Sequence, residues 1–317
     1  MTVFNIVLTK TAIMVALLAI GYLFGRKKLV SENARRDIAI IVSRFLLPVY
    51  IFHAMSQNIN PDNLISNIAY LGWGTLFIAI AMGSAWLISR IVPGSKVGKL
   101  MCYYVLSFPN IAYFGYPVTE AAFGTEAMVQ FIIFSLPCNL VLNTYGIYVL
   151  TSQRNSEDAK FHLTPQILKS LPFELLTGIC LGIIAGLLQI PFPKIVTDFL
   201  TFTSNGMSPI SMILAGLILA TQPLSKLFRS GRAYIISILK IFIMPILLGG
   251  IAYLCGLRGF ELIYLVTLNC LPVGMNVVIF ARPEQPDYTD TTVIYFISYI
   301  FGLVGVPLMV ALVSAIA

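Results

Sequence analysis

Charged residues are scarce in this chain of 317 residues, of which Asp, Glu, Lys and Arg together make up 10%. An ordinary soluble domain carries roughly 25%. Hydrophobic residues make up 58% of the chain, and the mean hydropathy is +0.89. So few charges cannot cover a water-soluble surface, so the composition predicts an integral membrane protein.

Residues typical of catalytic and metal sites are also scarce. There are only two histidines, and no H-E-x-x-H, G-x-S-x-G or metal-spaced Cys/His pattern occurs. The five cysteines lie in apolar stretches without a C-x-x-C pair, which indicates packing residues rather than disulfides. No aspartate falls in mid-span, which argues against an antiporter built on intramembrane carboxylates. We therefore predict no enzyme activity, no metal site and no cofactor.

The net charge of +7 does not indicate a nucleic-acid partner, because the basic residues sit in short connections between apolar segments. Those segments have the length of about 20 residues that a bilayer core requires. The sequence predicts an all-α membrane protein with ten transmembrane helices. They are expected at Phe4 to Gly25, Ile38 to Met55, Ile68 to Ser89, Leu100 to Phe123, Ala127 to Thr151, Leu171 to Ile190, Val196 to Ala220, Ala233 to Gly256, Phe260 to Ala281 and Thr291 to Ile316.

The connections alternate in charge along the chain. Odd-numbered connections hold nearly all of their Lys and Arg residues, which predicts that they are cytoplasmic and that both termini are extracytoplasmic. The first apolar stretch has no basic segment before it and is followed by Arg26, Lys27 and Lys28, so we expect a retained helix rather than a signal peptide.

The longest polar connection divides the predicted helices five and five. Because five is odd, the second set enters the membrane in the opposite sense, as two inverted repeats require. The proline pairs Pro48 with Pro209 and Pro109 with Pro272 have nearly equal spacing, which favours a duplication. We therefore predict a first repeat at 1–151, a cytoplasmic linker at 152–170 and a second repeat at 171–317.

The fourth and ninth predicted helices each contain an interruption. Residues 107–117 read SFPNIAYFGYP, and residues 269–276 read NCLPVGMN. Proline and glycine at mid-membrane depth disfavour a continuous helix. Paired interruptions at matching positions indicate a transporter binding site, although ordinary kinks satisfied by neighbouring helices are the alternative.

Unwound backbone in a membrane is tolerated where it is buried in protein or lines a cavity, and helix N-termini there offer N–H groups to an anion. Neutral amide and hydroxyl side chains would add hydrogen bonds without a buried countercharge. The candidate substrate-binding residues are Pro109, Asn110, Tyr113, Pro272, Gly274 and Asn276.

Each charge within a predicted span needs a role. Lys240 lies deep in its span and could neutralise carbonyl ends at the crossing or face the anion, while Glu120 and Arg282 lie at span ends. We take these three as candidates for charge compensation. Lys10 and Arg44 lie near helix ends, which favours snorkelling to the interface. A lone histidine such as His53 is more often a hydrogen-bonded packing residue, and a role as a proton relay stays open.

Several motifs together resemble the auxin efflux carrier family of bacterial organic-acid permeases, which is similar to the plant PIN-FORMED auxin exporters. The resemblance covers nearly the whole chain. It rests on Leu47-Pro48, Pro109-Asn110 with Gly115-Tyr116-Pro117, Ser208-Pro209, Leu271-Pro272-Val273-Gly274, Ile279-Phe280-Ala281 and Pro286-Asp287.

The resemblance implies a scaffold made of helices one, two, six and seven. Helices three to five and eight to ten would form a moving transport domain in an elevator-type mechanism. It implies organic-anion substrates, contact of Asn110 with the substrate carboxylate, and a homodimer as an open alternative to a monomer. This chain lacks the long cytoplasmic loop of the plant exporters and has Glu120 where they commonly have lysine. A dicarboxylate such as malate is therefore the expected substrate.

Other functions stay open at this point. The chain could export an auxin-like aromatic carboxylate, act as a membrane sensor that transports nothing, or conduct ions, although no ring of selective residues is evident. The coupling ion is open as well, because sodium could bind unwound carbonyl groups and a proton could accompany the substrate.

Overall fold

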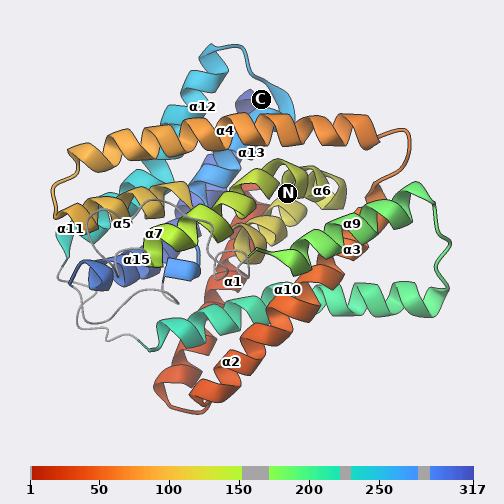
Figure 1. Ribbon diagram of the computed structural model, residues 1–317, viewed down its shortest axis with the longest axis horizontal. Coiled ribbons are helices and arrows are strands. Elements are labelled where there is room, and N and C mark those ends of the chain that lie inside the picture. The colour runs from red at the N-terminus through yellow and green to blue at the C-terminus, as the bar shows by residue number, and fades with distance from the viewer. Residues whose placement is uncertain (1, 152–170, 222–229, 278–285) are drawn as a thin grey trace.

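The computed structural model describes residues 2–151, 171–221, 230–277 and 286–317, and within them the regular structure is helical (Figure 1). The all-α prediction is thereby confirmed. The α-helices are α1 (Val3–Arg26), α2 (Glu32–Ile41), α3 (Leu47–Asn58), α4 (Leu64–Ile91), α5 (Lys96–Ser107), α6 (Tyr116–Val141), α7 (Ile147–Thr151), α9 (Phe173–Leu187), α10 (Lys194–Leu219), α11 (Gly231–Ile238), α12 (Met244–Leu254), α13 (Gly259–Cys270) and α15 (Pro286–Ile316). The π-helical turns are Val42–Leu46, Ile111–Gly115, Leu142–Gly146 and Leu239–Ile243.

Seven helical stretches within the described residues are long and apolar enough to cross a membrane. Two shorter helices, α9 and α13, are also apolar. The seven stretches are Val3–Arg26, Glu32–Asn58, Leu64–Ile91, Ile111–Leu150, Lys194–Leu219, Gly231–Leu254 and Val293–Ile316.

The stretch from Ile111 to Leu150 is not one regular helix. Gly124 has φ 86° and ψ 174°, a conformation that side chains disfavour, and it interrupts α6. The interruption lies between two segments that the sequence predicts as separate spans, 100–123 and 127–151.

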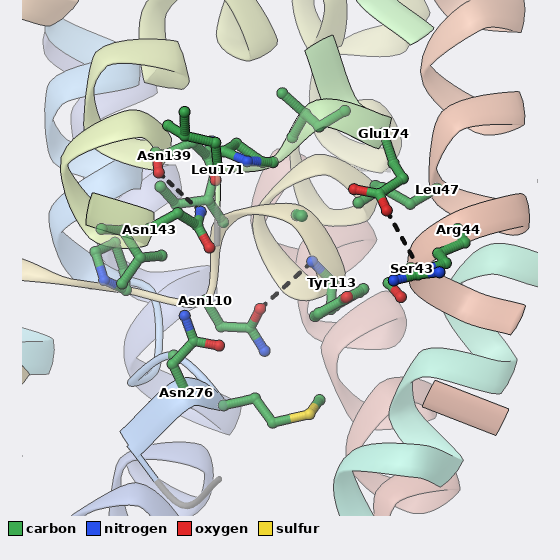
Figure 2. A pocket seen from close by; sticks show the side chains of 18 residues that line it. Ser43, Arg44, Leu47, Asn110, Tyr113, Asn139, Asn143, Leu171, Glu174 and Asn276 are labelled. Carbon is green, nitrogen blue, oxygen red and sulfur yellow. Dashed lines mark hydrogen bonds and ion pairs between the residues drawn. The ribbon is translucent and has the colours of Figure 1, made fainter. Parts of the chain in front are cut away.

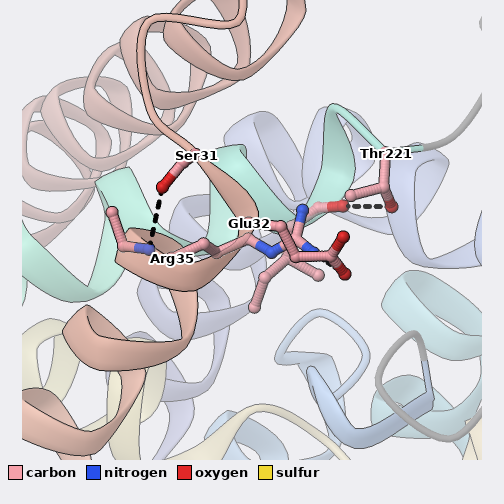
Figure 3. A network of polar contacts seen from close by, with 6 residues as sticks. Ser31, Glu32, Arg35 and Thr221 are labelled. Carbon is pink, nitrogen blue, oxygen red and sulfur yellow. Dashed lines mark hydrogen bonds and ion pairs between the residues drawn. The ribbon is translucent and has the colours of Figure 1, made fainter.

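Serine side chains cap the N-termini of several helices. Ser31, Ser95 and Ser230 each accept a hydrogen bond from the backbone N–H three residues further on, which satisfies a free N–H of the first turn. Beside Ser31, Glu32 and Arg35 form an ion pair of 3.2 Å at the start of α2 (Figure 3). This pair is largely exposed on the Glu32 side, so its contribution to stability is small.

Prolines account for three of the π-helical turns. Each of these turns ends two residues before a proline, namely Pro48, Pro117 or Pro245. A proline has no backbone N–H and cannot donate to the preceding turn, so the helix widens locally there. The chain thus bends without leaving the helical conformation.

Glycines allow two pairs of helices to touch through their backbones. A Cβ atom at Gly21 or Gly216 would lie 2.1 or 2.0 Å from a carbonyl oxygen of the opposite helix, so the backbones of α1 and α10 are in contact there without room for a side chain. Two glycines of α9 act likewise, because Gly178 and Gly182 face the backbone of α3. Figure 1 shows α9 alongside α3.

Candidate functional site

The two predicted interruptions meet in space. Helix α5 ends at Ser107 and α13 ends at Cys270, and the non-helical residues that follow run antiparallel, with a bridge between Pro109 and Val273. The Asn110 N–H donates to the Pro272 carbonyl at 2.8 Å, and the Gly274 N–H donates to the Phe108 carbonyl at 3.2 Å. Each unwound segment therefore satisfies part of the backbone of the other, as burial in a membrane protein requires.

This crossing needs small residues. A Cβ atom at Gly274 would lie 3.3 Å from the Pro109 carbonyl oxygen, and one at Gly115 would lie 2.6 Å from Leu271. The Ser298 hydroxyl, from α15, accepts a hydrogen bond from the Val273 N–H at 3.1 Å. The crossing is therefore tightly packed and fixed by neighbouring helices.

Asn110 caps the helix that resumes after the first interruption. Its Oδ1 accepts from the Tyr113 N–H at 3.4 Å, and its Nδ2 donates to the Tyr299 hydroxyl at 2.5 Å. Only 3% of Asn110 is exposed. An amide has two N–H groups and two lone pairs on oxygen, so each end of this side chain retains hydrogen-bonding capacity.

A cavity of about 290 Å³ lies beside the crossing (Figure 2). Four asparagine side chains, Asn110, Asn139, Asn143 and Asn276, line it and provide neutral donors and acceptors from several helices. Figure 2 shows Asn110 and Asn276 projecting into the same part of the cavity from the two interruptions. The other lining residues are Ser43, Arg44, Leu47, Pro109, Ile111, Ala112, Tyr113, Leu142, Leu171, Pro172, Glu174, Leu175, Gly274 and Met275.

One ion pair lies at this cavity. Arg44 Nε is 3.4 Å from Glu174 Oε1, with side chains that are 71% and 39% exposed (Figure 2). The sequence predicted that Arg44 snorkels to the interface, but it did not show that Arg44 also lines this cavity. Since both partners are accessible, the guanidinium can exchange the carboxylate of Glu174 for that of a ligand.

Lys240 is fully buried but does not line this cavity. Its Nζ donates to the Leu106 carbonyl at 3.0 Å, one residue before α5 ends. Of the two roles considered from the sequence, contact with a carbonyl at the crossing is the one that the structure shows. A buried cation there compensates the negative end of the α5 dipole.

A second cavity, of about 270 Å³, lies further along α6 and is lined by Pro117, Glu120 and Thr125 of that chain segment. Lys10 of α1 and His53 of α3 also line it. Lys10 was expected to snorkel, so its position in a polar cavity adds a role that the sequence did not indicate.

Most of the predicted substrate-binding residues line the first cavity. Pro109, Asn110, Tyr113, Gly274 and Asn276 line the first cavity, and Pro272 contributes its carbonyl to the crossing. Glu120 belongs to the second cavity and Lys240 to neither, while Arg282 lies outside the described residues.

Sequence reasoning missed Asn139 and Asn143 because the paired interruptions pointed to the fourth and ninth predicted helices, whereas these two residues lie in the fifth, with Pro137 two residues before Asn139. Their spacing of four residues places both on one helical face, which is the signal that was available. No cluster of three or more potential metal-ligating side chains occurs within the described residues.

Comparison with known proteins finds transporters among the relatives of this chain. An "Uncharacterized transporter" of Methanothermobacter thermautotrophicus is 26% identical over 305 residues, which cover 95% of this chain and 96% of the relative. The "Uncharacterized transporter YfdV" of Escherichia coli K12 is 20% identical, over 84% of this chain and 85% of the relative.

A plant protein matches a shorter segment. "Auxin efflux carrier component 6" of Arabidopsis thaliana is 28% identical over 125 residues, which cover 39% of this chain and 22% of that protein. Residues 6–310 match the family described as "Membrane transport protein", which confirms the resemblance noted from the sequence. This chain is therefore a multi-pass membrane protein and belongs to that family of transporters.

Proposed function

We propose that the protein is a secondary carrier or uniporter of small organic anions, with a dicarboxylate such as malate as the substrate. The observation that carries the proposal is the crossing of two unwound segments beside a cavity of about 290 Å³. This volume lies at the lower edge of ligand pockets, which range from roughly 300 to 1,000 Å³, and so suits a small molecule.

The chemistry of the cavity supports an anion. The positive end of the helix dipole that begins at Ile111 faces the crossing, and the amides of Asn110 and Asn276 can donate to a carboxylate. Among the described residues that line the cavity, Arg44 is the basic side chain, and it can bind a second carboxylate. A dicarboxylate would use both ends of this arrangement.

The proposed architecture has ten membrane crossings in two inverted repeats. Dividing Ile111–Leu150 at Gly124 and adding α9 and α13 to the long stretches gives this number. Contacts between helices are consistent with the repeat, since an exchange of the two halves would convert the α1 and α10 pair into the α9 and α3 pair.

In the proposed elevator mechanism these two glycine-packed pairs form the scaffold, and the helices around the crossing move past them with the anion. The protein would lie in the cell membrane with both termini outside. This orientation follows from the concentration of Lys and Arg in alternate connections.

Uptake of labelled malate into proteoliposomes tests the proposal. We expect Asn110→Ala and Pro272→Ala to reduce uptake at least tenfold relative to the wild type, a change equivalent to about 1.4 kcal/mol. Asn58→Ala is the matched control, because the Asn58 amide bonds the Ala54 carbonyl and lines neither cavity. Equal uptake by all four proteins would remove the site assignment.

The match to an auxin efflux carrier component supports a second candidate, the export of an aromatic carboxylate. Competition between labelled malate and indole-3-acetate in the same vesicles separates the two substrates. Stabilisation of the protein by a ligand without flux would instead indicate a sensor.

A further inference from the structure

The second cavity combines a carboxylate with a hydrogen-bond network that spans two helices. The Tyr50 hydroxyl, on α3, donates to Glu120 Oε2 at 2.6 Å, and the same hydroxyl lies 2.7 Å from Met128 Sδ (Figure 1 shows α3 and α6). A tyrosine hydroxyl has one hydrogen, so it can serve only one of these two acceptors at a time.

This network accommodates both protonation states of the carboxylate. When Glu120 is ionised, Tyr50 donates to it. When Glu120 takes up one proton from hydronium of the surrounding solution, which leaves water, its charge changes from −1 to 0. The new O–H then donates to the Tyr50 oxygen, and the Tyr50 hydrogen turns to Met128. No hydrogen bond is lost in either state, so the site can gain and release a proton without leaving a buried polar atom unpaired.

The other groups of the cavity set the electrostatic consequence. Within the part of the chain that the structure describes, its other ionisable side chains are Lys10 of α1 and His53 of α3, while α10 contributes hydroxyl and amide groups. Ser204 is 8% exposed, and its buried hydroxyl has no hydrogen-bond partner among the described residues. The same is true of Nδ1 of His53. Protonation of Glu120 would raise the formal charge of this lining by one unit, with Lys10 as a cation of the same lining.

We propose that Glu120 is the proton-binding site of this carrier and that the proton enters with the organic anion. The inference rests on the proposed transport function. The proposed elevator mechanism requires α6 to move relative to α3, which separates Glu120 from the Tyr50 hydroxyl. Neutral Glu120 can enter an apolar interface at a much lower free-energy cost than the carboxylate can.

Infrared pH-difference spectroscopy on the full-length protein in lipid tests the proton site without any transport. We expect the wild type to show a protonated-carboxyl band that is lost in Glu120→Gln. The band should remain in Glu126→Gln, because Glu126 is exposed on the same helix and does not line the cavity. An unchanged band in Glu120→Gln would overturn the assignment.

Malate uptake with and without an acidic exterior tests the coupling. The ratio of the two uptake rates should fall to about one in Glu120→Gln and persist in Glu120→Asp and Glu126→Gln. Uptake by the wild type that follows an imposed sodium gradient and ignores the pH gradient would overturn the inference. If the infrared band behaves as expected while no organic anion is transported, the proposed function fails and the proton site stands.

Discussion

Replacing Gly216 by alanine tests the backbone contact between α1 and α10. The added Cβ would lie 2.0 Å from the Leu18 carbonyl oxygen and 2.6 Å from the Tyr22 nitrogen, whereas ordinary contact begins at 3.4 Å. The helices would have to separate by the difference, about 1.4 Å, because backbone atoms cannot rotate away. Overpacking costs about 1–3 kcal/mol, and this site belongs at the upper end of that range.

Alanine also favours the helix by about 1 kcal/mol relative to glycine, so the net loss expected for Gly216→Ala is about 2 kcal/mol. Gly250→Ala is the matched control, since Gly250 is helical and exposed, with no atom within 4 Å of its added Cβ. Denaturant-induced unfolding in detergent micelles measures the free energy of both variants. If Gly216→Ala were as stable as Gly250→Ala, α1 and α10 could not pack as described.

Three further substitutions have distinct expected outcomes. Lys240→Met should lower the free energy of unfolding by about 2 kcal/mol in the same assay, because the Leu106 carbonyl loses a charged donor; unchanged stability would contradict this role. Arg44→Gln should raise KM for malate uptake about tenfold but change stability by less than about 1 kcal/mol, since its ion pair is exposed. Gly124→Ala should lower the free energy of unfolding by about 1–3 kcal/mol, because a side chain is strained at its φ of 86°. Gly83→Ala is the control and should not lower it, because Gly83 is equally free of neighbours within 4 Å.

Proline and glycine made the crossing visible in the sequence. Pro109 and Pro272 each stand where a helix has just ended, and the chain chemistry that stops a helix is local. The partnership of the two segments is not local, so the hydrogen bond between Asn110 and Pro272 required coordinates.

Side chains with several possible environments were harder to place. Arg44 and Lys10 have long stems that fit a snorkelling role equally well, and only the packing of neighbouring helices puts them into cavities. The depth of Lys240 was evident, but its acceptor, the Leu106 carbonyl, belongs to a segment far away in the chain.

The sequence also did not show where a long helical stretch is interrupted. Gly124 divides a long apolar run, but an isolated glycine in such a run does not reveal a positive φ. The Tyr50 and Glu120 pair likewise joins residues on different helices, and neither carries a sequence signal for the other.

The reciprocal hydrogen bonds of the crossing bear on how the chain is made. During synthesis the first half emerges with the Phe108 carbonyl and the Asn110 N–H lacking their final partners, which arrive only once Pro272 and Gly274 have been translated. Until then these groups need water or other polar atoms, because hydrocarbon offers none. We therefore expect biogenesis to keep the first interrupted segment near the insertion machinery until the second one reaches it, and each half expressed alone to be degraded rapidly in the cell.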